Sequence, residues 1–259
     1  MGEEGKYIYC VVGTKDKKNF GPVGIGGRGD EVDTLCYEDL AAVISDSPVT
    51  KYPISRENTL AHQRVMEEVM KYYTILPVKF GTIAETKNGI PPEENIRERV
   101  LKGRYEELQG LLETMNNKVE LGVKALWTDM KVIFGEIVDK NKEIRRLRNW
   151  AATRPAGQTR DAKIKLGEMV QSALEKKKTR QEKLILDALK KISVDHRTNR
   201  LFGDKMILNA AFLVEADRKE KEFDDLINEL STEYQGRIKF KYVGPSPPCN
   251  FVELTITWE

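Results

Sequence analysis

The residues that could act as nucleophiles, acid–base catalysts or metal ligands are few in this 259-residue chain. It has two histidines, His62 and His196, and three cysteines, at positions 10, 36 and 249. A cysteine beside a histidine can perform covalent catalysis, and two histidines at helical spacing can bind zinc. His62 has no Glu-x-x-His neighbour, and His196 is far from it in a polar stretch. We therefore interpret His62 as structural, bonded to a backbone carbonyl or facing an interface. An enzyme that uses His62 with a cysteine is kept as an alternative.

Two other patterns resemble sites of chemistry. The pairs Glu67-Glu68 and Glu93-Glu94 are adjacent in sequence, so on a helix they point to different faces and do not form a carboxylate dyad. The stretch Gly24–Gly29 reads G-x-G-x-x-G, but the dinucleotide fingerprint needs a strand directly before it and a helix after it. Here the preceding strand ends earlier and a strand follows, which predicts a flexible loop. The sequence thus predicts no enzyme, no cofactor and no metal site.

Charge is unevenly distributed along the chain. Overall, 43 basic residues nearly balance 41 acidic ones, whereas residues 139–191 hold 16 Lys and Arg against 7 Asp and Glu. Within this segment, Arg145, Arg146 and Arg148 precede Trp150, a combination that phosphate-backbone sites often show. A charged helix face explains the same pattern. A nucleic-acid-binding or regulatory protein that uses this basic arm is therefore the alternative function, although no nucleic acid is expected as the main partner.

Composition indicates a cytoplasmic protein. The longest apolar runs are far shorter than the ~20 residues that span a bilayer, so no membrane is expected as a partner. The N-terminus is acidic and lacks the apolar region of a secretory signal. The odd number of widely spaced cysteines argues against a disulfide framework.

The elements that must position any site alternate between strands and helices. In the first half we expect strands at 7–12, 32–37, 40–45 and 76–83, and helices from Ser55 and from Pro91. In the second half we expect a strand at 119–127, a helix from Thr128, a long helix at 159–192, and then strand, helix and strand up to Val243. A rigid turn at 244–248 and a last strand at 251–258 close the chain. The charged middle of the long helix, 175–183, is expected to be solvated.

This order predicts an α+β protein with two domains. Residues 1–117 form an N-terminal α+β domain. Residues 118–259 form a C-terminal ferredoxin-like domain, because strand and helix alternate there as in a split β-α-β sandwich. An extended helical, coiled-coil-like insertion at about 139–195 lengthens its first crossover.

Several segments in this order resemble the gas vesicle protein F/L family. The closing segment, Gly-Pro-Ser-Pro-Pro-Cys-Asn-Phe at 244–251, looks like the family's Gly-Pro-Trp-Pro-Pro-Tyr-x-Phe, with Ser246 and Cys249 in place of aromatics. The other matching segments are 5–13, 42–46, 60–67, 76–82 and 209–214. The resemblance covers nearly the whole chain outside about 139–200, and it does not distinguish F from L.

The resemblance implies a non-enzymatic accessory or minor structural protein of gas vesicle assembly. Its expected partners are the small hydrophobic shell subunit and other gas vesicle accessory proteins, met during nucleation or at the gas-facing side of the shell. The expected location is the cytoplasm, in association with the gas vesicle. An aggregation-prone subunit needs a partner that offers a sheet edge or an apolar groove, and a long helical arm is suited to such contacts.

The family motifs also nominate site residues. We expect one set to fix the turn and strand packing of the first domain: Leu76, Pro77, Phe80 and Gly81. We expect a second set to do the same in the second domain: Gly244, Pro245, Pro247, Pro248 and Phe251. His62, Gln63 and Arg64 either hold the two domains together or face a partner.

Overall fold

The computed structural model describes residues 4–216 and 218–258, which divide into two compact units. Unit 1 contains the described residues up to 120 together with those from 244 onward, and unit 2 contains residues 121–243. Each unit combines a β-sheet with helices, which confirms the predicted α+β class. The chain passes from unit 1 to unit 2 within one strand and returns within another, so unit 1 is built from both ends of the chain.

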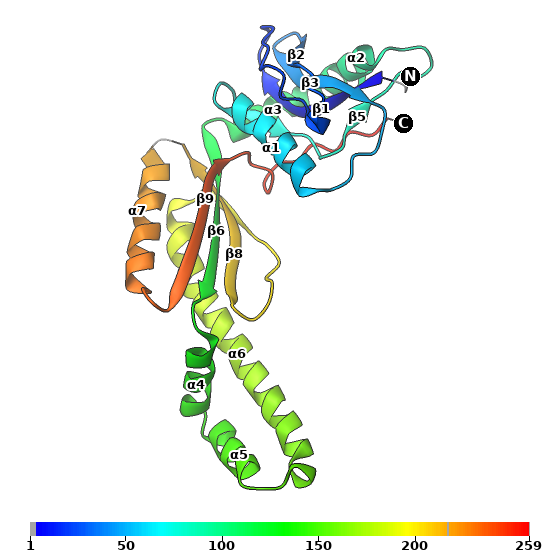
Figure 1. Ribbon diagram of the computed structural model, residues 1–259. Helices are drawn as coiled ribbons and strands as arrows, with labels where there is room; N and C mark the ends of the chain where they lie inside the picture. The colour runs from blue at the N-terminus through cyan, green and yellow to red at the C-terminus, as the bar shows by residue number, and fades with distance from the viewer. Residues whose placement is uncertain (1–3, 217, 259) are drawn as a thin grey trace. The chain divides into compact units, whose positions relative to one another are not determined.

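Unit 1 is a five-stranded sheet built around β1, Glu4–Gly13 (Figure 1). Its strand order is β2-β3-β1-β4, with β5 also paired to β1, and the pairings are antiparallel. Residues 7–12 of β1 are all fully buried, which requires cover on both faces of the strand because side chains alternate. The other strands are β2 (Val32–Tyr37), β3 (Leu40–Pro48), β4 (Ile75–Pro77) and β5 (Ile83–Ala84).

Two groups of helices cover this sheet. Helix α1, Arg56–Met70, begins as predicted at Ser55, whose hydroxyl oxygen accepts a hydrogen bond from the backbone N–H of Asn58. Its buried residues Val65, Met66 and Val69 pack into a core cluster with residues of β1 and β3. The second group begins after Pro91 and also contacts strands β1–β4. It consists of α2 (Pro92–Asn95), the π-helix η2 (Ile96–Lys102) and α3 (Tyr105–Met115).

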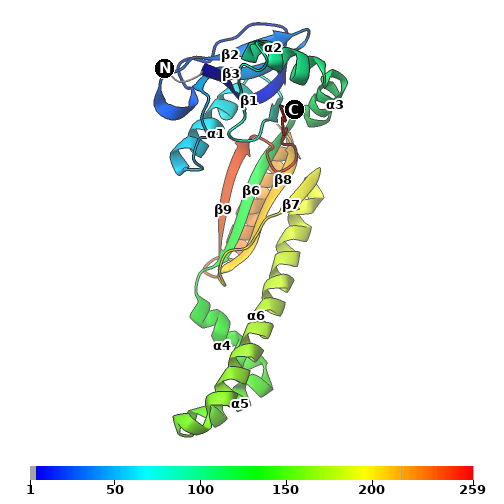
Figure 2. The ribbon, with the colours of Figure 1, turned by 90° about the vertical axis from the view of Figure 1, so that its right-hand side faces the viewer.

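Unit 2 has a four-stranded sheet in the order β7-β8-β6-β9 (Figure 2). With its helices, the chain order is β-α-β-β-α-β, the connectivity of a ferredoxin-like fold. Along β6, the residues Leu121, Val123, Ala125 and Trp127 are buried at alternate positions, as the sequence pattern predicts. Helices α6 and α7 contact β8, and Phe212 meets Phe223 of α7 at 5.3 Å between ring centroids. The bounds are β6 Lys118–Trp127, β7 Asp195–Thr198, β8 Met206–Glu215, β9 Ile238–Ser246 and α7 Arg218–Glu233.

The predicted helical insertion is present as three helices in unit 2 (Figures 1 and 2). Helices α4 (Met130–Lys140) and α5 (Lys142–Ala152) run out along α6 (Arg160–Leu189), which leads back to the sheet. The helix predicted from Thr128 ends at Lys140, and Asn141 begins a new one: its side-chain oxygen caps α5 by accepting from the N–H groups of Glu143 and Ile144.

The charged middle of α6 is solvated only in part: Lys176, Arg180 and Lys183 are exposed, as predicted, whereas the residues that face α4 are not. Lys178 is buried, with 6% of its surface exposed. Helix α4 packs against α6 here, and Lys177 forms a 2.7 Å ion pair with Glu136 of α4. Tertiary packing thus buries Lys178, whose sequence context alone indicated solvent.

The chain after Val243 also differs from the prediction. Strand β9 continues to Ser246 through a cis peptide bond between Gly244 and Pro245, where a turn was expected. The expected last strand at 251–258 is an extended segment with a single bridge, in which Leu254 lies parallel to Val78. The residues from 244 onward belong to unit 1, whereas the sequence analysis assigned them to the second domain. The reason is that their hydrogen-bond partners include Pro77, Lys79 and Glu120, which belong to unit 1.

Two smaller differences concern short strands. The expected strand at 76–83 is two short strands, β4 and β5, separated by a turn. Strand β7 was not expected, because its sequence Asp-His-Arg-Thr is polar, and it forms by antiparallel pairing with β8.

Candidate functional site

His62 occupies an enclosed position between α1 and the sheet of unit 1, where it is 6% exposed. Its Nδ1 lies 3.0 Å from the hydroxyl oxygen of Tyr7, and its ring stacks on Tyr9 and meets the edge of Phe80. Burial lowers the pKa of His62 to about 4, and a hydrogen bond to the backbone of Val78 offsets this only in part. A neutral imidazole in this setting joins the helix to the sheet.

Two buried tyrosines of β1 extend this polar cluster. The Tyr7 hydroxyl accepts a 2.9 Å hydrogen bond from the backbone N–H of Gly81. The Tyr9 hydroxyl accepts one of 2.8 Å from Ile25 and lies 2.9 Å from the hydroxyl of Ser45. Burial raises the pKa of Tyr9 to about 12, so the phenol stays protonated and able to donate. From the sequence, both tyrosines are predicted only as part of the strand at 7–12. The choice of tyrosine over phenylalanine at buried positions is the signal that could have revealed their polar role.

Gln63 and Arg64 lie on the exposed side of α1, next to the buried His62. The Gln63 amide nitrogen donates a 2.7 Å hydrogen bond to Glu67 one turn later. Arg64 lines an open cavity of about 890 Å³ whose other walls come from the glycine-rich loop. The three neighbouring residues therefore divide between a core position and a surface that a partner can reach.

The residues nominated around β4 lie together in unit 1. Leu76 and Pro77 are buried and pair with Val11 and Cys10 of β1. Phe80 packs against the core cluster that contains His62's neighbours on β1. Gly81 has a positive φ of 81°, which favours glycine, and its N–H reaches Tyr7. This turn therefore positions the chain so that the tyrosine hydroxyl is satisfied.

The nominated residues of the closing segment belong to the same unit. Pro247 and Pro248 are buried, and the Pro248 carbonyl accepts hydrogen bonds from the N–H groups of Phe251 and Val252. Further on, the Leu254 N–H donates to the Pro77 carbonyl at 2.7 Å. The closing segment is thus hydrogen-bonded through Leu254 to Pro77, a residue of the first nominated set.

Glu120 holds this closing segment and was missed by the sequence analysis. Its two carboxylate oxygens accept hydrogen bonds from the backbone N–H and the side-chain amide of Asn250, at 2.8 and 2.6 Å. Burial raises the pKa of Glu120, and the two bonds from Asn250 act in the opposite direction. Alternation along β6 places Glu120 opposite the buried residues 121 and 123, which indicates an exposed position. The returning chain covers it.

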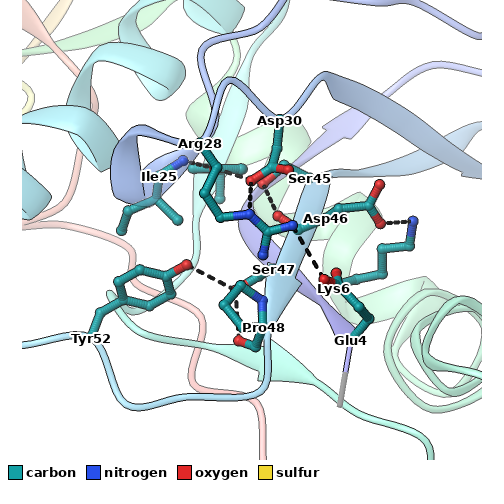
Figure 3. Close-up of polar contacts among 11 residues, drawn as sticks. Glu4, Lys6, Ile25, Arg28, Asp30, Ser45, Asp46, Ser47, Pro48 and Tyr52 are labelled. Carbon is teal, nitrogen blue, oxygen red and sulfur yellow. Dashed lines mark hydrogen bonds and ion pairs between the residues drawn. The ribbon is translucent and has the colours of Figure 1, made fainter. Parts of the chain in front are cut away.

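An ion pair joins the glycine-rich loop to the start of β1, and a second one nearby joins β1 to β3 (Figure 3). Arg28 lies 3.2 Å from both Glu4 and Asp30, and Lys6 lies 2.5 Å from Asp46 on the neighbouring strand. The loop leads into strand β2 and not into a helix, so the arrangement of a dinucleotide site is not formed. The loop is a structural connection of unit 1.

Other candidate residues are not brought together in this way. Arg145, Arg146 and Arg148 lie exposed on α5 in unit 2. His196 lies on β7, where its ring stacks on Phe212. Over residues 4–216 and 218–258, the structure contains no group of three or more His, Cys, Asp or Glu residues able to hold a metal ion. Within the same ranges, no helix has the length and apolar character needed to cross a membrane.

Comparisons with known proteins agree with this geometry. A family model described as "Gas vesicle synthesis protein GvpL/GvpF" matches residues 5–253. The chain is 34% identical to gas vesicle protein F of a Streptomyces species, over 90% of this chain and 93% of that protein. It is 25% identical to gas vesicle protein F1 of Halobacterium salinarum, over 98% and 95% of the two chains.

Solved structures show the same fold. The crystal structure of GvpF from an Anabaena species matches with a TM-score of 0.79 at 20% identity, covering 97% of this chain and 99% of that one. GvpF from Microcystis aeruginosa matches with a TM-score of 0.75 at 20% identity, covering 96% and 99%. The family match spans both units, including the closing segment as far as residue 253. The chain therefore belongs to the GvpL/GvpF family of gas vesicle synthesis proteins.

Proposed function

We propose that this chain is a non-enzymatic accessory protein that binds the small hydrophobic gas vesicle shell subunit and other accessory proteins. It does so during nucleation or at the gas-facing side of the shell, in association with the gas vesicle in the cytoplasm. The observation that carries the proposal is the family match over residues 5–253, which supports a role in gas vesicle assembly. The enclosed position of His62, hydrogen-bonded to Tyr7, supports a structural and not a catalytic use of that histidine.

An apolar groove in unit 2 supports contact with an apolar subunit. The groove lies between α5 and α6 and measures about 510 Å³. Its apolar surface comes from Leu147, Trp150, Ala162 and Met169, and four charged residues also line it: Glu143, Arg146, Asp161 and Lys165. Trp150 keeps 39% of its surface exposed. A large aromatic side chain beside a groove is a typical anchor for an apolar helix or side chain of a partner.

The first experiment is a pull-down of the purified protein with freshly expressed shell subunit, at low salt and at about 0.5 M salt. We expect capture that resists salt, because an apolar or main-chain interface is not screened. Capture at low salt alone would instead assign the interaction to the basic helices. No capture under either condition would contradict direct binding and leave other accessory proteins as the partners.

Two variants locate the contact. Trp150→Glu places a charge in the groove and should reduce salt-resistant capture about tenfold or more. Ile164→Glu is the matched control, because Ile164 is also exposed on α6 but does not line the groove. Equal loss in both variants would mean that the groove is not the contact surface.

The alternative of a nucleic-acid-binding protein rests on the exposed arginines of α5. It predicts binding to duplex or single-stranded DNA or RNA that falls steeply with salt and is lost when Arg145, Arg146 and Arg148 are replaced by glutamine. Absence of binding at low salt would eliminate this alternative.

A further inference from the structure

A second cavity in unit 2 is lined by more cations than carboxylates and by one buried amide without an acceptor. The cavity measures about 520 Å³ and lies where α4 packs against α6, next to the start of β9. Its charged residues are five cations and, among the described lining residues, one carboxylate: Lys140, Lys176, Lys177, Arg180, Arg237 and Glu136. An anion entering this cavity would meet a strong excess of positive charge.

The single carboxylate of the cavity, that of Glu136, is already paired with two of the cations. Glu136 accepts from Lys177 at 2.7 Å and from Arg237 at 2.6 Å. Burial acts to raise the pKa of Glu136, but the bonds from these two cations outweigh it and hold that pKa below its usual value. Glu136 therefore stays ionised and paired, and it leaves the other cations of the cavity without compensation.

The remaining donors are available to a ligand. Within the described parts of the chain, Lys140, Lys176 and Arg180 have no carboxylate within ion-pair distance, and all three are exposed. Gln181 also lines the cavity, and its amide nitrogen is buried with no hydrogen-bond partner among the described residues. A buried amide N–H without an acceptor is costly, so an acceptor from outside would stabilise the site.

The apolar part of the lining identifies the kind of ligand. Ile137, Ala173 and Leu184 line the same cavity, and Leu184 keeps 53% of its surface exposed. No aromatic ring is among the described lining residues, so the cavity offers no surface on which a nucleotide base could stack. Aliphatic surface beside unpaired cations is complementary to a peptide that carries both carboxylates and aliphatic side chains.

We propose that this cavity, which we name the α4–α6 basic cavity, is a docking site for an acidic peptide segment of a partner protein with an aliphatic anchor residue. Carboxylates of the segment pair with Lys140, Lys176 and Arg180, a backbone carbonyl or carboxylate accepts from Gln181, and an aliphatic side chain covers Leu184. The proposal does not depend on the identity of the protein that supplies the segment, nor on the groove between α5 and α6.

The test measures binding of a fluorescein-labelled peptide of glutamate and leucine to the full-length protein by fluorescence anisotropy. The cavity variant replaces Lys140, Lys176 and Arg180 with glutamine. The control variant replaces Arg160, Lys163 and Lys183 with glutamine, which removes the same charge from exposed positions of α6 outside the cavity. We expect the cavity variant to weaken binding about tenfold or more and the control by less than about twofold, because three ion pairs are lost only in the first.

Two further measurements test whether the aliphatic surface of the cavity contributes to binding in addition to its charge. Leu184→Ala should weaken binding of the glutamate–leucine peptide about threefold and leave a glutamate–glycine peptide of equal charge unchanged. Equal losses in the cavity and control variants would overturn the proposal in favour of non-specific attraction. So would the absence of peptide binding by the natural protein at low salt. Stronger binding of a single-stranded oligonucleotide that depends on the same three residues would assign the cavity to nucleic acid instead.

Discussion

At the scale of single residues, the structure explains why its best candidate for chemistry is structural. His62 is enclosed by aromatic rings and bonded to Tyr7, so its imidazole is neutral at physiological pH. Neither of its neighbours Gln63 and Arg64 shares this environment, because successive residues of a helix point in different directions. One motif of three residues therefore serves two purposes, with the histidine in the core and the other two at the surface.

The pKa of His62 gives a testable pH dependence. In the unfolded chain a histidine takes up a proton near pH 6.5, whereas in the folded protein His62 does so only near pH 4. The unfolded state thus binds more protons between these values, and the free energy of unfolding falls as the pH falls from 6.5 to 4. The shift corresponds to about 3 kcal/mol at pH 4.

Urea unfolding of the natural protein and of His62→Gln at several pH values measures this term. Carboxylates titrate in both proteins, so the difference between the two curves isolates His62. We expect the stability advantage of the natural protein to shrink by about 3 kcal/mol from pH 7 to pH 4. A difference that stays constant over this range would contradict the enclosed, neutral histidine.

Glu120 provides a second prediction at this scale. Asn250→Asp replaces the amide that donates at 2.6 Å with a second carboxylate, so two like charges meet in a partly buried site where Glu120 loses its hydrogen-bond donor. We expect a loss of about 2 kcal/mol at pH 7, and a smaller loss at pH 4, where one carboxyl binds a proton. Asn228→Asp, at an exposed position of α7, is the control and should change stability by less than about 0.5 kcal/mol. Thermal unfolding at the two pH values checks both.

At the scale of elements, the segment after β9 acts as an extra edge for β4. Both backbone groups of Leu254 are hydrogen-bonded to residues 77–79: its N–H donates to the Pro77 carbonyl at 2.7 Å, and its carbonyl accepts from the Lys79 N–H at 3.0 Å. The side chain of Leu254 is also buried. Only Leu254 pairs in this way, so the pattern of 251–258, which predicts a full strand, overestimates how far the pairing extends.

Leu254→Pro tests this pairing. Proline removes the N–H that reaches Pro77 and the buried leucine side chain, and we expect a loss of about 3 kcal/mol or more in the free energy of unfolding. Thr255→Pro is the control, since Thr255 is exposed and its N–H makes none of the backbone hydrogen bonds found between described residues. Similar stability of the two variants, measured by urea unfolding, would argue against the bridge to β4.

At the scale of the whole molecule, the two units divide the chain in an unexpected way. Unit 2 is continuous in sequence, whereas unit 1 needs residues from both ends of the chain. Removal of the last residues is therefore expected to affect the unit that lies first in the sequence. The domain boundary drawn at 117 from sequence leads to the opposite expectation.

Truncation after Val243 distinguishes these expectations. We expect amide hydrogen exchange to become faster in β1 and β4 of unit 1 by roughly tenfold or more, because Glu120 and the Pro77 carbonyl lose their partners. Exchange in β8 of unit 2 should change little. Faster exchange in β8 with an unchanged β1 would show that the closing segment stabilises unit 2 instead.

Much of this molecule was determined by local sequence. Strands β1, β2 and β8 were predicted from short runs of β-branched, aromatic and other apolar residues, and β6 from its alternation. Helix α1 was predicted from its cap and helical spacing, and α6 from helical spacing. The family resemblance followed from short motifs whose residues are close in the chain. Features of this kind are visible in sequence because each depends on neighbours a few positions away.

Other features were decided only by tertiary structure, because they depend on pairs of residues that are distant in sequence. The burial of Glu120 depends on Asn250, and the course of the closing segment depends on Pro77. Strand β7 exists because β8 offers it hydrogen bonds, although its own residues are polar. The α4–α6 basic cavity likewise arises where two helices and the start of a strand meet, and no local pattern indicates which of the many lysines and arginines lie there unpaired.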